Sequence, residues 1–232
     1  MTLQGQMSEA TDPFSAPTSI KVVYEVFSLP LKNAASMRRG RLPDAKIYER
    51  IVADLSVGAA KQEAFLVARC VPEMKILASQ GTMYRYPTEF DPAELPNQVD
   101  GPISRKTKEG EELTVFPVTP SNPTTYESRL LGKSIELYAK LKEGDRVTLS
   151  VTPKSETLVG KDTYGYGVAK QELPRFAAPV LGTSVTVAAG RPFLLGTISP
   201  PLEQQPKEGE TVTHLAFVTV TLVKHAKDSP KK

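Results

Sequence analysis

Two neighbouring stretches in the C-terminal half alternate apolar and polar residues, and this alternation constrains the fold more than any other feature. The stretches are Ser134–Leu141 and Arg146–Thr152, and in the second the apolar residues from Val147 to Val151 share one face. A period of two residues is that of a β-strand with one buried face. The residues between them, Lys142–Asp145, contain a Gly-Asp pair that is typical of turns. We therefore predict an antiparallel hairpin.

Other segments rich in β-branched and aromatic residues predict further strands. They are Ile20–Leu29, Lys61–Val71, Ala178–Ala188 and Thr213–Val223. Two shorter runs, Lys75–Ser79 and Thr82–Tyr86, flank Gln80-Gly81, which has the composition of a hairpin turn. The chain is thus expected to consist mainly of strands at hairpin spacing.

The segment GRPFLLGTISPP predicts one more strand, Phe193–Ile198. Gly196 would tolerate either a β-bulge or close packing inside it, and the following Pro-Pro pair would end it. In a regular strand Phe193, Leu195 and Thr197 face one side, and Leu194 and Ile198 face the other. Because both faces then carry apolar residues, we expect this strand to be covered on both sides.

The N-terminal third contains the helical signals. Ala34–Arg39 predicts a short helix that ends at Gly40. A longer helix is predicted over residues 44–57, where Ile47, Ile51 and Leu55 recur every four residues. Gly58 is placed to terminate it. The apolar stripe is interpreted as a surface that faces the core.

Together these signals predict a mainly β (α+β) fold: an antiparallel β-sandwich-like core with one or two N-terminal helices packed on a sheet. We expect Val185–Ile198 to pair with Phe217–Leu222. The expected organisation is a disordered leader at 1–19, a strand-helix-strand-hairpin unit at 20–96, a Pro-rich and charged loop at 97–124, an antiparallel β half at 125–224 and a basic tail at 225–232.

The composition excludes several classes of protein. The 29 basic and 26 acidic residues give a net charge of only +3, which argues against a nucleic-acid-binding face. The single cysteine, Cys70, allows no internal disulfide and fits a small buried apolar residue. No apolar run has the length of a transmembrane helix. The first residues are polar, and we expect that a signal peptide has been removed.

Catalytic signals are absent from the sequence. The two histidines, His214 and His225, are far from any nucleophile pattern, and no zinc-ligand spacing occurs. There is also no phosphate-binding loop and no nucleophile elbow. We therefore predict no enzymatic activity, no cofactor and no metal.

The candidate contact residues are Tyr164 and Tyr166, which lie between glycines in Asp162–Gly167. Two interpretations of this segment stay open. It is either a platform on which a sugar stacks or a glycine-rich loop tip between two strands.

The order of the C-terminal segments resembles the β-domain of bacterial secretins, which serve secretion and type IV pilus systems. The matching pieces are Arg129-Leu-Leu-Gly132, Ile135-Glu-Leu137, Glu143-Gly-Asp145, Thr148-Leu-Ser-Val-Thr-Pro153 and Thr183–Ile198. Where secretins continue into part of their gate, this chain has Ser199–Pro206 instead. The resemblance therefore implies a soluble, degenerate relative that keeps the β-scaffold and lacks the gate.

An N-terminal segment, Tyr86–Pro96 (YPTEFDPAELP), also resembles secretin-associated envelope proteins and pilus-associated proteins of mucin-degrading gut bacteria. These resemblances imply a non-enzymatic protein that supports assembly or anchoring of a type IV pilus or secretin-like system. Its expected partners are pilus or secretin-system proteins, and its expected location is the periplasm, the outer membrane or the cell surface. The alternative is an adhesin or glycan-binding module that contacts surface glycans through Tyr164 and Tyr166.

Overall fold

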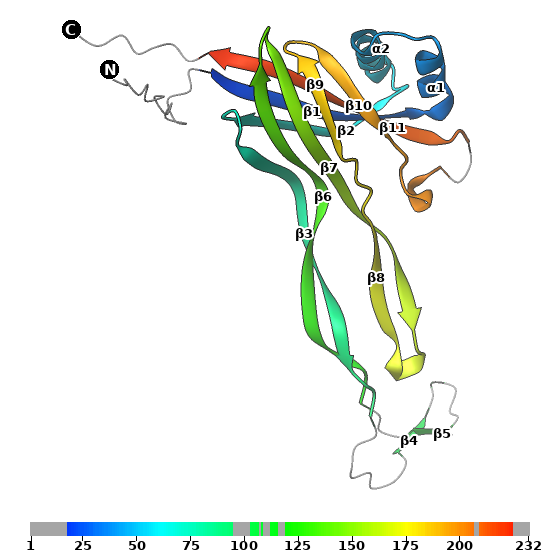
Figure 1. Ribbon diagram of the computed structural model, residues 1–232. Coiled ribbons are helices and arrows are strands. Elements are labelled where there is room, and N and C mark those ends of the chain that lie inside the picture. Colours follow the sequence, from blue (N-terminus) through cyan, green and yellow to red (C-terminus); the bar gives the residue numbers. More distant parts are fainter. Residues whose placement is uncertain are drawn as a thin grey trace, which may run out of the picture. The chain divides into compact units, whose positions relative to one another are not determined.

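The computed structural model describes residues 18–94, 103–106, 108, 112–115, 119–206 and 209–224 (Figure 1). Its elements are, in chain order, β1 (Thr18–Pro30), α1 (Leu31–Arg39), α2 (Asp44–Ser56), β2 (Lys61–Cys70), β3 (Lys75–Asp91), β4 (Ile103–Lys106), β5 (Glu112–Val115), β6 (Asn122–Lys142), β7 (Arg146–Tyr164), the 3-10 helix η1 (Gly167–Ala169), β8 (Gln171–Ala177), β9 (Thr183–Ala188), β10 (Pro192–Ile198), the 3-10 helix η2 (Leu202–Gln204) and β11 (Val212–Lys224).

The chain divides into two compact units. Unit 1 comprises Met1–Gln80, Gly132–Ser155 and Ala178–Lys232, and unit 2 comprises Gly81–Leu131 and Glu156–Ala177. Strands β3, β6 and β7 contribute residues to both units.

Two main antiparallel sheets contain most of the strands. Sheet 1 has the order β10-β11-β1-β2, and sheet 2 has the order β3-β6-β7-β8 with β9 paired to β7. In sheet 1, Val22 of β1 lies opposite Val220 of β11 and Ala68 of β2. The predicted mainly β fold with antiparallel sheets is confirmed.

Within unit 1, sheet 1 packs face to face on its part of sheet 2. The predicted alternation produces this core, because every second residue of each strand points inward. The fully buried side chains at its centre are Ile20, Val22, Ile135, Leu137, Ala139, Val147, Leu149, Val151, Ala216, Val218 and Val220. Cys70 is buried beside them, as predicted.

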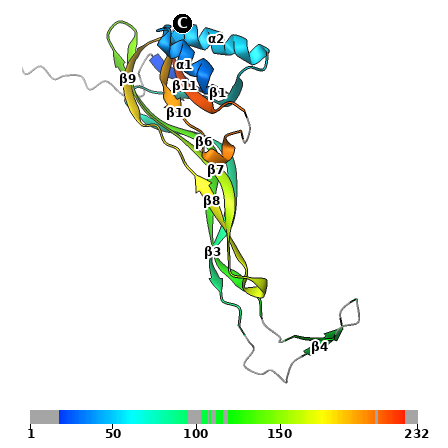
Figure 2. The same ribbon diagram turned by 90° about the vertical axis from the view of Figure 1, so that its right-hand side faces the viewer.

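Helices α1 and α2 cover the opposite face of sheet 1 (Figures 1 and 2). The predicted stripe on α2 faces this second core, with Ile47 and Ile51 fully buried and Leu55 partly buried. Gly58 follows the helix with a φ of 72°, so it supplies the left-handed residue at the helix end. Sheet 1 is therefore the middle layer of three.

One charged residue lies in this second core. Glu25 of β1 is buried, and its carboxylate accepts hydrogen bonds from Tyr48 Oη at 2.8 Å and from Gln62 Nε2 at 3.0 Å. Burial, followed by the hydrogen bond to Glu25 and its charge, raises the pKa of Tyr48 to about 12. The phenol is thus held neutral, and its hydrogen bond compensates in part for the hydration that the Glu25 carboxylate loses on burial.

The predicted hairpin at Gln80-Gly81 is wrong. Strand β3 runs unbroken from Lys75 to Asp91 and pairs with β6. A two-residue hairpin of the primed type requires glycine with a positive φ, and Gly81 does not have one. The other predicted turn, at Lys142–Asp145, is present and joins β6 to β7, with positive φ at Gly144 and Asp145.

The predicted pairing of Val185–Ile198 with Phe217–Leu222 is only half right. Strand β10 pairs with β11, but β9 pairs with β7 in the other sheet. The chain changes sheet at Gly190, whose φ is 81° and whose N–H donates to the carbonyl of Val220 at 2.7 Å. A glycine turn between two strands signals a reversal but does not show which sheet the second strand joins.

Strand β10 contains the predicted bulge, one residue before the expected position. Leu194 lies opposite Phe217 and Gly196 opposite Ala216, so Leu195 is the extra residue. Phe193 and Leu195 pack on the core between the sheets and Leu194 packs under the helices, as predicted. Beyond the bulge the faces are exchanged, because one extra residue inverts the alternation.

The exchange of faces makes two predictions wrong, because Thr197 was placed on the face of Phe193 and Ile198 on the face of Leu194. Thr197 is exposed, and Ile198 lies opposite His214 on the interior side, where it lines a cavity with Tyr24.

Several predicted segments lie partly or wholly outside the described residues. Within 97–124, the structure describes the short paired strands β4 and β5 and the start of β6. Thr18 and Ser19 belong to β1, whereas residues 1–17 and the basic tail 225–232 lie outside the described part.

Replacement of Leu195 by Asp is expected to lower the free energy of unfolding by about 3 kcal/mol, because a carboxylate would enter the core between the sheets without a partner. The control is Arg191→Ala at an exposed position of the preceding turn, which should change it by less than about 0.5 kcal/mol. Urea denaturation of both variants measures the difference. Equal stability of the Leu195→Asp variant and the parent would show that β10 does not contribute to the core.

Replacement of Tyr48 by Phe is expected to cost about 1 to 3 kcal/mol, because the buried Glu25 carboxylate then loses a donor. The raised pKa of Tyr48 means that the neutral phenol stabilises the fold below pH 10. That stabilisation is lost as the pH rises from 10 to about 12.

The Tyr48→Phe variant should therefore show a smaller loss of stability between pH 9 and pH 12 than the parent, measured by urea denaturation. Tyr138→Phe, at an exposed position on β6, is the control. A variant with an unchanged alkaline profile would contradict the role given to this hydrogen bond.

Candidate interaction site

The two predicted contact residues, Tyr164 and Tyr166, lie at the tip of the hairpin formed by β7 and β8 in unit 2. Tyr164 is the last residue of β7 and lies opposite Gln171 of β8. Between them the chain forms the 3-10 helix η1, in which Ala169 N–H donates to the carbonyl of Tyr166 at 3.1 Å. The interpretation of the segment as a glycine-rich loop tip between strands therefore describes its backbone.

Glycine at position 165 is required by this backbone. Its φ is 71°, and a Cβ atom there would lie 2.5 Å from the carbonyl oxygen of Ala169. Because such a contact is too short for any side chain, the tip can close in this form only with glycine. The tight closure holds Tyr164 and Tyr166 on either side of Gly165.

Both tyrosines present their rings to solvent. Tyr166 is 90% exposed and Tyr164 is 55% exposed. A tyrosine ring has an apolar body and a polar hydroxyl, and such residues are enriched where proteins contact other molecules. The tip thus offers two aromatic contacts on a short, constrained loop.

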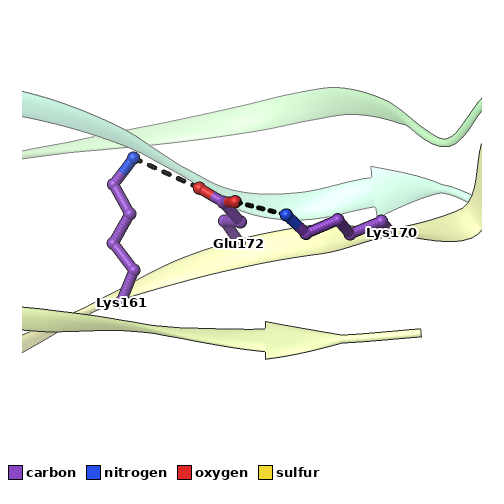
Figure 3. Close-up of polar contacts among 3 residues, drawn as sticks. All are labelled: Lys161, Lys170 and Glu172. Carbon is purple, nitrogen blue, oxygen red and sulfur yellow. Dashed lines mark hydrogen bonds and ion pairs between the residues drawn. The ribbon is translucent and has the colours of Figure 1, made fainter. Parts of the chain in front are cut away.

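Charged residues at the base of the tip form a small cluster. Glu172 of β8 accepts from Lys170 Nζ at 2.8 Å and from Lys161 Nζ at 3.3 Å (Figure 3). These hydrogen bonds, together with the positive charges of both lysines, hold the pKa of Glu172 below its usual value. The cluster has one more positive charge than negative, so it adds a weakly basic surface next to the tyrosines.

A cluster of aromatic rings supports unit 2 away from the tip. Tyr84 and Tyr86 of β3 stack with ring centroids 6.2 Å apart, and both contact Phe176 of β8. Arg129 of β6 lies 4.8 Å above the Phe176 ring and pairs with Glu156 of β7 at 2.9 Å. These contacts join β3, β6, β7 and β8 within the unit.

The sequence predicted neither the ionic cluster nor the aromatic cluster. The sequence predicted a short strand at Thr82–Tyr86, but Phe176, the ring partner of Tyr86, lies 90 positions further along the chain. Lys161 and Glu172 are likewise brought together only by the pairing of β7 with β8, in which Thr163 lies opposite Glu172.

Among the described residues, no group of three or more His, Cys, Asp or Glu side chains could hold a metal ion. No helix in the same part of the chain has the length and apolar character needed to cross a membrane.

Comparison with known proteins gives no family assignment. No protein-family model matches the chain. No curated protein matches it either.

Solved structures similar to the chain are secretins and secretin complexes. The V. cholerae type IV competence pilus secretin PilQ has 14% identity and a TM-score of 0.35 over 89% of this chain and 60% of that one. A chain of the Klebsiella pneumoniae type II secretion system outer membrane complex has 12% identity and a TM-score of 0.42. The match covers 90% of this chain and 40% of that one.

The Salmonella SPI-1 type III secretion injectisome secretin InvG has 11% identity and a TM-score of 0.37. The match covers 92% of this chain and 65% of that one. This chain thus covers less than two thirds of each of the three. At such identities and TM-scores, the likeness by itself assigns no function or partner.

Replacement of Gly165 by Ala is expected to destabilise the protein by about 1 to 3 kcal/mol, because the new Cβ atom meets the Ala169 carbonyl and the φ is left-handed. Gly182→Ala is the matched control, since a Cβ atom there has open space and its φ is not positive. Thermal unfolding of both variants measures the cost. If both variants melt with the parent, the tip is not constrained at Gly165.

Proposed function

We propose that this chain is a non-enzymatic cell-envelope protein that supports the assembly or anchoring of a type IV pilus or secretin-like system. It acts by binding other proteins of that system in the periplasm or at the outer membrane. The secretin-like segments serve as a rigid scaffold in this role, and the partners bind the surface.

The observation that carries the proposal is the place of the secretin-like segments in the fold. Ile135–Leu137, Thr148–Pro153 and the start of Thr183–Ile198 lie in β6, β7 and β9, which are neighbours in sheet 2. Their apolar residues fill one core with those of sheet 1. The matched segments up to Ala188 therefore share one layer, whereas the end of Thr183–Ile198 forms β10 in sheet 1.

The surface of unit 1 suits contact with another protein. Phe65 and Val67 are about half exposed on β2, which is an edge strand of sheet 1. An edge strand with exposed apolar side chains can bind a partner through both backbone hydrogen bonds and side-chain burial. This favours protein binding over a passive structural role.

The test is isolation of the tagged chain from native envelope after mild cross-linking, with identification of its partners by mass spectrometry. We expect pilus or secretin-system proteins to be enriched over an untagged strain. A Phe65→Gln/Val67→Thr variant should lose most of that enrichment, because its edge surface is no longer apolar. Tyr138→Ala, at another exposed aromatic position, should retain it. Enrichment of unrelated proteins alone would contradict the proposal.

A second function is supported by the tip of unit 2. A tyrosine that is 90% exposed, as Tyr166 is, suits stacking on a sugar ring, and Tyr164 lies beside it. A glycan-binding module would bind mucin-type sugars saturably and would lose that binding on Tyr164→Ala or Tyr166→Ala. Tyr138→Ala is again the control. Calorimetric titration with mucin-type oligosaccharides distinguishes this function from the first, because envelope partners are not needed.

A further inference from the structure

Three polar residues continue the apolar, inward-facing positions at one end of the core of unit 1. Lys133 precedes Ile135 by two positions on β6, and His214 precedes Ala216 by two on β11. Ser155 follows the buried Pro153 by two on β7. Because alternate residues of a strand share a face, all three point between the sheets rather than outward.

These residues line an interior cavity of about 20 Å³. Tyr24 forms part of the same wall, and the double proline Pro200-Pro201 that ends β10 forms another part. A cavity of this size holds about one water molecule or one oxygen atom of a larger group. The segment after β10 therefore forms part of the wall of a partly open cavity with a mostly apolar lining, a role beyond simply ending a strand.

The cavity contains a cation, Lys133, for which no ion pair is found among the described residues. Lys133 Nζ donates a hydrogen bond to Ser155 Oγ. Burial lowers the pKa of Lys133, and the negative charge of Glu63 opposes this only in part. A half-buried ammonium group of this kind is costly unless an anion neutralises it.

The neighbouring His214 is shifted toward its neutral form, in which it can still donate one N–H hydrogen bond. Burial lowers the pKa of His214, and the positive charge of Lys133 lowers it further, while Glu63 acts in the opposite direction. The other titratable groups that line the cavity are Tyr24 and Lys154, and neither supplies a negative charge, because burial raises the pKa of the Tyr24 hydroxyl. One bound anion would therefore interact favourably with both Lys133 and His214.

We infer that this cavity binds a carboxylate group, with Lys133 as its ionic partner and with Ser155 and His214 as hydrogen-bond donors. A carboxylate carries one charge, which matches Lys133, the one partly buried lysine of the lining, because Lys154 is exposed. One of its oxygens fits a space for one water, whereas a phosphate group must place more oxygens there. The carboxylate can come from a free small acid or from the C-terminus of a peptide. The inference does not depend on the proposed function.

The test follows the imidazole signals of His214 by NMR in a His225→Gln background, where His214 is the only histidine. Sodium acetate, exchanged for sodium chloride at constant ionic strength, should raise the pKa of His214 saturably by about one unit, because it places a negative charge beside the ring. No saturable change, or an equal change with inorganic phosphate, would overturn the inference.

Two further ligands distinguish the sources of the carboxylate. A short peptide with a free C-terminus and the same peptide with a C-terminal amide are titrated in the same way. Tighter binding of the acid peptide than of acetate, without binding of the amide, assigns the site to a chain terminus. Binding of acetate alone assigns it to a small free acid. Equal binding of both peptides would overturn the role of the carboxylate.

Variants separate binding from folding. Lys133→Met should raise the pKa of His214 without ligand, since a like charge is removed, and should abolish the acetate effect. Its melting temperature should equal or exceed that of the parent, because methionine is buried at less cost. Ser155→Ala keeps the cation and should weaken acetate binding severalfold. Lys140→Met, at an exposed position of β6, is the control and should change none of these values. An acetate effect that persists in Lys133→Met would refute the site.

Discussion

The fold depends on the burial of both faces of two central strands. In β1 the four consecutive residues Tyr24–Phe27 are buried, and in β11 the run Leu215–Val218 is buried. A strand of this kind must be covered by a separate layer on each side. The paired sheet supplies one layer and helices α1 and α2 supply the other. The positions of all other elements of unit 1 follow from this requirement.

The same requirement explains how a charge is accommodated in β1. Glu25 points toward the helices, where it is buried, and its carboxylate accepts hydrogen bonds from Tyr48 of α2 and Gln62 of β2. Tyr48 also packs edge-on against Phe27 and Phe217, with ring centroids 5.8 and 5.5 Å away. The helix is thus fixed to the sheet by ring packing, by the Tyr48–Glu25 hydrogen bond and by a hydrogen bond from Leu194 N–H of β10 to Asp44 Oδ2 at 3.1 Å.

Local patterns in the sequence were enough to predict the fold class and most elements of unit 1, but not β8 or the full lengths of β3, β6 and β7. The alternation of Val147, Leu149 and Val151 gave a strand with a fully buried face, and the four-residue period of Ile47 and Ile51 gave a helix on the core. Pairing was harder to predict, because β9 and β10 are separated by only three residues yet join different sheets. The composition of a strand indicates whether it is buried. Which sheet it joins depends on the backbone conformation of the three residues that link β9 to β10, around Gly190.

The same limit applies to the candidate sites: a site within one segment can be predicted from the sequence, whereas a site built from several strands cannot. Tyr164 and Tyr166 could be selected because glycines next to aromatic residues are visible in six consecutive positions.

The cavity around Lys133 could not be selected, since Lys133, Ser155 and His214 come from three strands and each looks like an ordinary polar residue at a strand end. They form a site only because the register places all three on the interior side, beyond the last apolar layer of the core. An alternating strand that continues past its apolar residues carries its polar residues inward as well. The end of a sandwich is therefore where a β protein can enclose a charge without breaking its core.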